Sequence, residues 1–158
     1  MSKRINRRPP PAPTPAVAPV HSYTIEKLNI DAVPGEGVQV LRLPVDAAAG
    51  DVLIAMASQV FTTKEEQSNA LTWCDLFLSQ DPAAIAAASE DLYFASQGGT
   101  NITPAEHHFL FVLNGAVTVP STGTWYAILS VYWDEDLSLP GRIEQGANYG
   151  KLDVVAFR

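Results

Sequence analysis

Three short groups of side chains in this sequence could do chemistry: an acid beside two histidines, an acidic run, and a set of aromatic rings. Glu106, His107 and His108 are of the types that bind metal ions or transfer protons. Adjacent residues on a strand face opposite sides, however, so two neighbouring histidines do not readily chelate one ion. We therefore expect no metal site and no cofactor here, and we expect the histidine pair to begin a strand.

The densest acidic run is Asp134, Glu135 and Asp136, directly after the most regular strand pattern of the chain. Calcium needs six or more oxygen ligands, and the loop spacing of an EF-hand is missing. A solvated turn explains the run better than a cation site. The run is also a candidate acidic dock for a basic segment of another chain.

The aromatic rings of Trp125, Tyr126, Tyr132 and Trp133 could stack on a sugar. Rings on a strand with alternating faces more often fill the core or a subunit interface. Trp125 and Tyr126 are therefore candidate glycan contacts, with core packing as the alternative.

Motifs of the common enzyme classes are missing from the sequence. The glycine pair in SQGGTNITP (96–104), which we predict to be a loop, lacks the lysine of a P-loop and the spacing of a dinucleotide-binding motif. No G-x-S-x-G or H-E-x-x-H is present, and the three histidines have no nucleophile beside them. We predict a protein that is not an enzyme. The alternative is a small hydrolase or lyase that uses Glu106, His107 or His108.

The elements that would position these groups are mainly strands. The pattern predicts a turn at AAAGD (47–51) and a hairpin or bulge at the Asn114-Gly115 pair. Because no repeated βα rhythm occurs, the fold class should be all-β, an antiparallel sandwich of jelly-roll type. The predicted strands are 38–45, 51–61, 70–79, 107–120, 122–135 and 151–158.

One segment departs from the strand pattern. Residues 81–95 (DPAAIAAASEDLYFA) are rich in alanine, with Asp81 as a helix N-cap and Pro82 at the first helical position. The sequence therefore predicts one short helix in a loop of the sandwich.

The first 22 residues are predicted to form an extended arm, and residues 23–158 the sandwich domain. The first 20 residues hold six of the 12 prolines and four of the ten Lys and Arg residues, so polyproline II geometry is expected. The other residues carry six bases against 17 acids, a formal charge of −11. A positive arm on a negative body suggests a tether to a negative partner. The residues expected to anchor the arm, to a neighbouring subunit or to nucleic acid, are Lys3, Arg4, Arg7, Arg8, Pro9, Pro10 and Pro11.

Cysteine content and hydropathy indicate in which compartment the protein is made and whether it contacts a membrane. Cys74 is the only cysteine, which excludes an intrachain disulfide and favours a place in the core. No apolar run is long enough to span a bilayer, and prolines stand where a signal peptide needs an apolar segment. We expect no membrane contact and synthesis in a host cytoplasm.

Two segments, KRINRRPPPAPTP (3–15) and NGAVTVPSTGTWYAILSVYW (114–133), resemble the arm and the aromatic strand of small bacteriophage virion proteins. These proteins carry a basic or proline-rich N-terminal arm on a β-sandwich or jelly roll. The resemblance implies a shell component of the virion, trimeric or of higher order, whose arm grips other copies or a major capsid protein.

The function expected from sequence and resemblance is that of a minor capsid or decoration protein that stabilises a particle. One alternative is a receptor- or glycan-binding head or fibre module. Another is a capsid protein whose basic arm binds the packaged genome, which steep salt dependence of oligonucleotide binding would reveal.

Overall fold

The computed structural model describes most of the chain after residue 19. The backbone is described for residues 20–24, 29–31, 37–63, 67–103, 108–133, 141–144 and 150–158. Side chains are described for residues 37–60, 73–98, 110–132 and 150–158.

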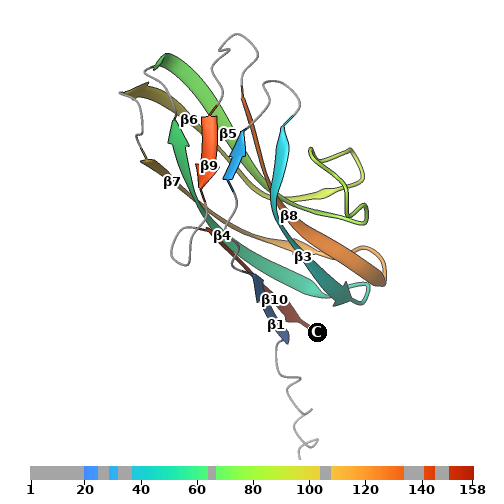
Figure 1. Ribbon diagram of the computed structural model, residues 1–158. Coiled ribbons are helices and arrows are strands. Elements are labelled where there is room, and N and C mark those ends of the chain that lie inside the picture. Colours follow the sequence, from blue (N-terminus) through green and yellow to red (C-terminus); the bar gives the residue numbers. More distant parts are fainter. Residues whose placement is uncertain are drawn as a thin grey trace, which may run out of the picture.

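The described residues form strands and turns, with no helix among them. The strands belong to two antiparallel sheets that pack face to face (Figure 1). Sheet A contains β1 (Val20–Thr24), β2 (Asn29–Asp31), β4 (Val52–Thr63), β7 (His108–Thr118), β9 (Gly141–Glu144) and β10 (Gly150–Phe157). Sheet B contains β3 (Val38–Ala47), β5 (Gln67–Ser79), β6 (Leu92–Thr103) and β8 (Gly123–Trp133).

The pairing of the eight longer strands is nested. β5 pairs with β6, β4 with β7, β3 with β8, and β1 with β10, each pair antiparallel. Two further antiparallel contacts, β10 with β4 and β5 with β8, join these pairs into the orders β1-β10-β4-β7 and β3-β8-β5-β6. A long hairpin rolled up in this way is a jelly roll. The predicted all-β sandwich is confirmed.

The core lies between the sheets and is formed by alternate residues of each strand. On β8, the side chains of Trp125, Ala127, Leu129 and Val131 point into it. Cys74 is also buried there as a free thiol, in agreement with its predicted place. Sheet A contributes Leu53, Ala55, Ala57, Phe111, Leu113, Leu152, Val154 and Ala156.

The predicted strand at 38–45 contains a proline, which the sheet order explains. Pro44 lies in β3, and β3 is the end strand of sheet B, hydrogen-bonded to β8 alone. An edge strand tolerates proline because the missing N–H would point away from the sheet.

The predicted helix at 81–95 is wrong. Residues 81–91 form turns, and β6 begins at Leu92. The carboxylate of Asp81 accepts a hydrogen bond from the N–H of Ala83, two residues on, at 2.8 Å. The carbonyls of Pro82 and Ala84, which a helix would use internally, instead accept hydrogen bonds from side chains of β3. Tertiary contacts therefore override the helix propensity of the alanines.

The predicted hairpin or bulge at Asn114-Gly115 is also wrong. β7 runs unbroken through both residues, with Asn114 opposite Met56 and Gly115 opposite Ala55. A Cβ at Gly115 would collide with the carbonyl oxygen of Phe94, so glycine is needed where β6 crosses β7 closely.

Two further predictions differ from the structure. The SQGGTN stretch, predicted to be a loop, lies within strand β6. β1 begins at Val20, so three residues of the predicted 1–22 arm pair with β10.

Candidate functional site

The outer face of sheet B is covered by the segment of residues 80–91 that joins β5 to β6. The side-chain nitrogen Nε2 of Gln39 donates to the carbonyls of Pro82 and Ala84, at 3.1 and 3.0 Å. Arg42 donates to the carbonyl of Pro82 at 2.8 Å. Figure 1 shows this segment, in yellow-green, outside the sheet. Phe77 and Ile128, which point away from the central core, are both fully buried.

A carboxylate is buried on this outer face of sheet B. Asp75 is 4% exposed and accepts a hydrogen bond from the hydroxyl of Ser96 at 2.5 Å. The pKa of Tyr93 is raised by burial and by the nearby charge of Asp75, with which its hydroxyl is hydrogen-bonded. Burial and the same charge raise the pKa of Tyr132. Ser130 faces Asp75 in the register of β5 and β8. Both pKa shifts favour the neutral form of the tyrosines over their anions.

Two aromatic rings stack beside this carboxylate. The rings of Trp73 and Tyr132 lie 6.4 Å apart between centroids and 10° from parallel. Gly98 makes room for the indole, because a Cβ at that position would come within 2.7 Å of the ring. Gly98, predicted to lie in a loop, is therefore a strand residue of β6 against which the ring of Trp73 packs.

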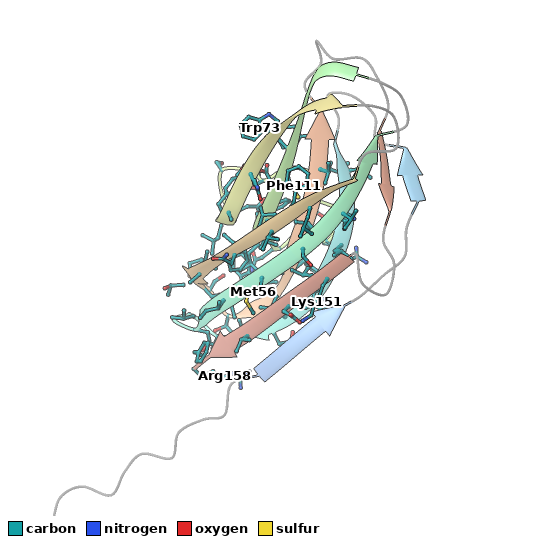
Figure 2. The ribbon with its side chains drawn as sticks, turned by 90° about the vertical axis from the view of Figure 1, so that its left-hand side faces the viewer. Met56, Trp73, Phe111, Lys151 and Arg158 are labelled. Carbon is teal, nitrogen blue, oxygen red and sulfur yellow. The ribbon has the colours of Figure 1, made fainter. Side chains whose placement is uncertain are left out.

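The outer face of sheet A is apolar and exposed. On β4 and β7, the described outward side chains are uncharged at every position, namely Val52, Ile54, Met56, Ser58, Val60, Leu110, Val112, Asn114, Ala116 and Thr118. Met56 is 48% exposed, Leu110 61% and Val112 56%. Figure 2 looks onto this face, with Met56 on β4 and Lys151 on β10 labelled. Lys151 and Asp153 form an ion pair on β10.

Of the two candidate glycan contacts, Trp125 is enclosed by protein. It is 3% exposed, and its indole N–H donates to the carbonyl of Ser121 at 3.1 Å. The ring thus follows the core alternative and has no free face for a sugar. Tyr126 is half-buried, with the guanidinium carbon of Arg42 5.8 Å from the centre of its ring. A glycan contact at Tyr126 stays a prediction.

The other predicted site residues lie outside the described part of the chain. These are the arm residues Lys3, Arg4, Arg7, Arg8, Pro9, Pro10 and Pro11, the acidic run Asp134, Glu135 and Asp136, and the pair Glu106 and His107. The backbone of His108 begins β7, which agrees with the predicted strand start.

Searches for two other kinds of feature in the described residues gave none. No cluster of three His, Cys, Asp or Glu side chains arranged to hold a metal ion occurs among them. The part of the chain that the structure describes also has no helix long and apolar enough to cross a membrane.

Two features of the faces were missed from the sequence. Residues 52–57 (VLIAMA) are apolar at every position, which predicts apolar side chains on both faces of β4. Asp75 had no such signal, because nothing in ALTWCDLFLS distinguishes a buried carboxylate from a solvated one.

Comparison of the fold with solved structures finds similar chains in viral particles and in a TNF. The chain is similar to a chain of the T13 viral particle of infectious bursal disease virus, with a TM-score of 0.50 and 10% identity, covering 96% of this chain and 40% of that one. It is also similar to a chain of T=1 particles derived from the same virus, at a TM-score of 0.48, 12% identity, and 96% and 40% coverage. The Eiger TNF of S. frugiperda matches at a TM-score of 0.46 and 7% identity, over 89% of this chain and 93% of that one.

The first of these likenesses shows a shared fold. The chain spans about two fifths of the length of that viral-particle chain, so the match corresponds to one part of that protein. No family model matches the sequence, and no curated protein is significantly similar to it. The fold class is thus established, and function has to be argued from the surfaces.

Proposed function

We propose that this chain is a structural protein of a virus particle, with a minor capsid or decoration role, and that it is not an enzyme. The observation that carries the proposal is the uncharged, exposed outer face of sheet A on a jelly-roll body. A solitary protein rarely leaves an apolar surface of this kind in water, whereas a shell subunit buries it. The fold likeness to the viral capsid chain supports this function.

The proposal assigns the anchoring role to the N-terminal arm. Lys3, Arg4, Arg7 and Arg8 are separated from the start of β1 by at least 11 residues, with prolines between them. Because proline dihedrals are already restricted, docking such a segment on a neighbour costs less entropy than docking a flexible one. Each copy would thereby gain contacts beyond its own body, in a trimer or a larger assembly.

The arm's resemblance to bacteriophage virion proteins supports a phage or phage-like particle as the setting. In such a particle the partners are other copies of this chain and a major capsid protein. The acidic run at 134–136 is the dock that charge complementarity favours for the arm.

The test compares the full chain with a chain that lacks residues 1–19, so that β1 is kept. Light scattering over a concentration series would report the mass of each, and electron microscopy would report particles. We expect the shortened chain to form smaller assemblies. Equal assemblies from both chains would refute the anchoring role.

A second variant, with Lys3, Arg4, Arg7 and Arg8 changed to Gln, separates charge from proline geometry. Loss of assembly in this variant indicates an electrostatic dock. If the variant assembles normally but loses a salt-dependent affinity for oligonucleotides, the arm binds the genome instead.

A further inference from the structure

The outward side chains of sheet A lie in rows across its strands. In one row Val155, Ile54 and Ala116 stand side by side on β10, β4 and β7. In the next row toward the C-terminus of β10, Phe157 and Val52 are neighbours. Across β4 and β7 the face has no charge to solvate it, and six of the eight large exposed apolar side chains of the described residues belong to it: Val52, Ile54, Met56, Leu110, Val112 and Phe157.

An antiparallel sheet with one solvated face normally alternates apolar residues inward with polar residues outward. The charged residues follow this rule on the end strand β3, where Arg42 and Asp46 point outward. β4 departs from it over Val52, Ile54 and Met56. The departure indicates that a second surface covers this face.

The charge of the chain favours a second copy as the covering surface. The whole chain has a formal charge of −7, so two copies repel each other wherever their carboxylates meet. The centre of the outer face of sheet A avoids this cost because β4 and β7 bring no carboxylate to it. Nucleic acid and anionic lipid have no cation to bind there.

The border of the face suits contact with an identical face. Lys151, on β10 next to Ser58, is half exposed and forms an ion pair with the buried Asp153. The acid is thus balanced within each copy, and across a two-fold axis no exposed carboxylate of β10 would meet its own counterpart. A polar border around an apolar centre is the usual arrangement of protein interfaces.

The size of the face predicts a weak contact. Val52 to Val60 spans about 27 Å of β4, and the three strands β10, β4 and β7 are about 14 Å wide, which gives roughly 800 Å² for two faces together. Such an area supports a reversible pair rather than a permanent one. In a shell of many copies, weak contacts of this kind act together.

We infer that two copies of this chain pair through the outer faces of sheet A, with Ile54, Met56 and Val112 in the buried centre of the contact. The inference deepens the proposed function by naming a self-contact that is separate from the arm. It does not depend on the arm being an anchor.

The experiment measures self-association by light scattering and sedimentation over a concentration series. Ile54→Glu is introduced into the full chain and into the chain lacking residues 1–19. The matched control is Ile85→Glu, the same change at an exposed isoleucine of the segment over sheet B. We expect Ile54→Glu to weaken pairing about tenfold or more in both chains, because it places an unpaired charge in the contact. We expect Ile85→Glu to leave pairing unchanged.

A mixing experiment guards against a variant that merely folds poorly. Ile54→Glu and Ile54→Lys copies should each be monomeric alone, and their mixture should regain paired mass because the two charges then attract. Unchanged pairing of Ile54→Glu would overturn the inference, as would a wild-type protein that is monomeric at every concentration. If the chain lacking the arm pairs more strongly than the full chain, the arm covers the face, which also overturns it.

The outcomes separate this inference from the arm proposal. Loss of pairing in Ile54→Glu, with no effect of arm removal, would support the face contact and refute the anchoring role. Loss of large assemblies on arm removal, with pairing retained, would support both.

Discussion

The two outer faces of this sandwich carry similar apolar side chains in opposite surroundings. On sheet B, Ile128 and Phe77 are fully buried beneath the segment of residues 80–91. On sheet A, Ile54 is 36% exposed and Met56 48%. Among the described residues, the chain covers one face by itself and leaves large apolar side chains exposed on the other. Apolar residues on both sides of a strand therefore predict that both sides are covered, and the tertiary structure shows which cover the chain supplies.

The largest expected difference between the two faces comes from changing an isoleucine to alanine on each of them. Ile128→Ala should lower the free energy of unfolding by about 2–5 kcal/mol, because it leaves a cavity under a covered face. Ile54→Ala should cost less than about 1 kcal/mol in the monomer, since its side chain is partly in water. Chemical denaturation at low protein concentration measures both. Equal losses would mean that the faces do not differ as described.

A second test concerns the corner where β6 of sheet B crosses β7 of sheet A. Gly115→Ala should destabilise the fold by about 1–3 kcal/mol, because the new Cβ would collide with the backbone carbonyl of Phe94. Relieving this collision requires the two strands to move apart, since a backbone atom cannot rotate away as a side chain can. Gly123→Ala is the control, since its Cβ would make an ordinary 3.5 Å contact with Gln80. A thermal melt of each variant compares them, and an unaffected Gly115→Ala would show that the strands can separate freely there.

A third test uses pH to probe the covered side. Burial, assisted by Asp75, raises the pKa values of Cys74, Tyr93 and Tyr132. Each folded-state pKa lies above its unfolded value, so the stability from these protons is complete below that value, about 8.5 for cysteine and 10 for tyrosine, and is lost as the pH rises. We expect the free energy of unfolding to fall above about pH 9, by up to ~1.4 kcal/mol per pH unit for the buried thiol.

Cys74→Ala provides the comparison for this pH effect. Denaturant titrations from pH 7 to 10.5 should give a shallower decline for the variant than for the parent. Parallel curves would show that the thiol ionises as easily in the folded chain as in the unfolded one.

The smallest expected effect concerns the cover itself. Gln39→Ala removes hydrogen bonds to the carbonyls of Pro82 and Ala84, which should cost about 0.5–1.5 kcal/mol. Hydrogen exchange should speed up within residues 80–91 more than in β4. An unchanged exchange rate in this segment would contradict the prediction. It would mean that contacts other than these hydrogen bonds hold residues 80–91 against sheet B.

The sequence by itself determined the strands and the interior. Alternation identified the longer strands, because one buried face imposes a period of two. The structure then shows that Trp125, Ala127, Leu129 and Val131 of β8 face the core. The lone cysteine and the proline in an edge strand were also consistent with the local pattern. These features depend on the burial of individual side chains, which local sequence records.

Tertiary structure alone decided the features that depend on contact between distant segments. The conformation of residues 81–91 is set by hydrogen bonds from side chains of β3 rather than by their alanine content. Glycine is required at position 115 by the close backbone of β6 rather than by a turn. The burial of Asp75 and the exposure of Ile54 likewise depend on which segments of the described chain lie over the outer face of each sheet. The physical reason is that propensity and alternation act between near neighbours, whereas the covering of a sheet is decided by segments remote in the chain.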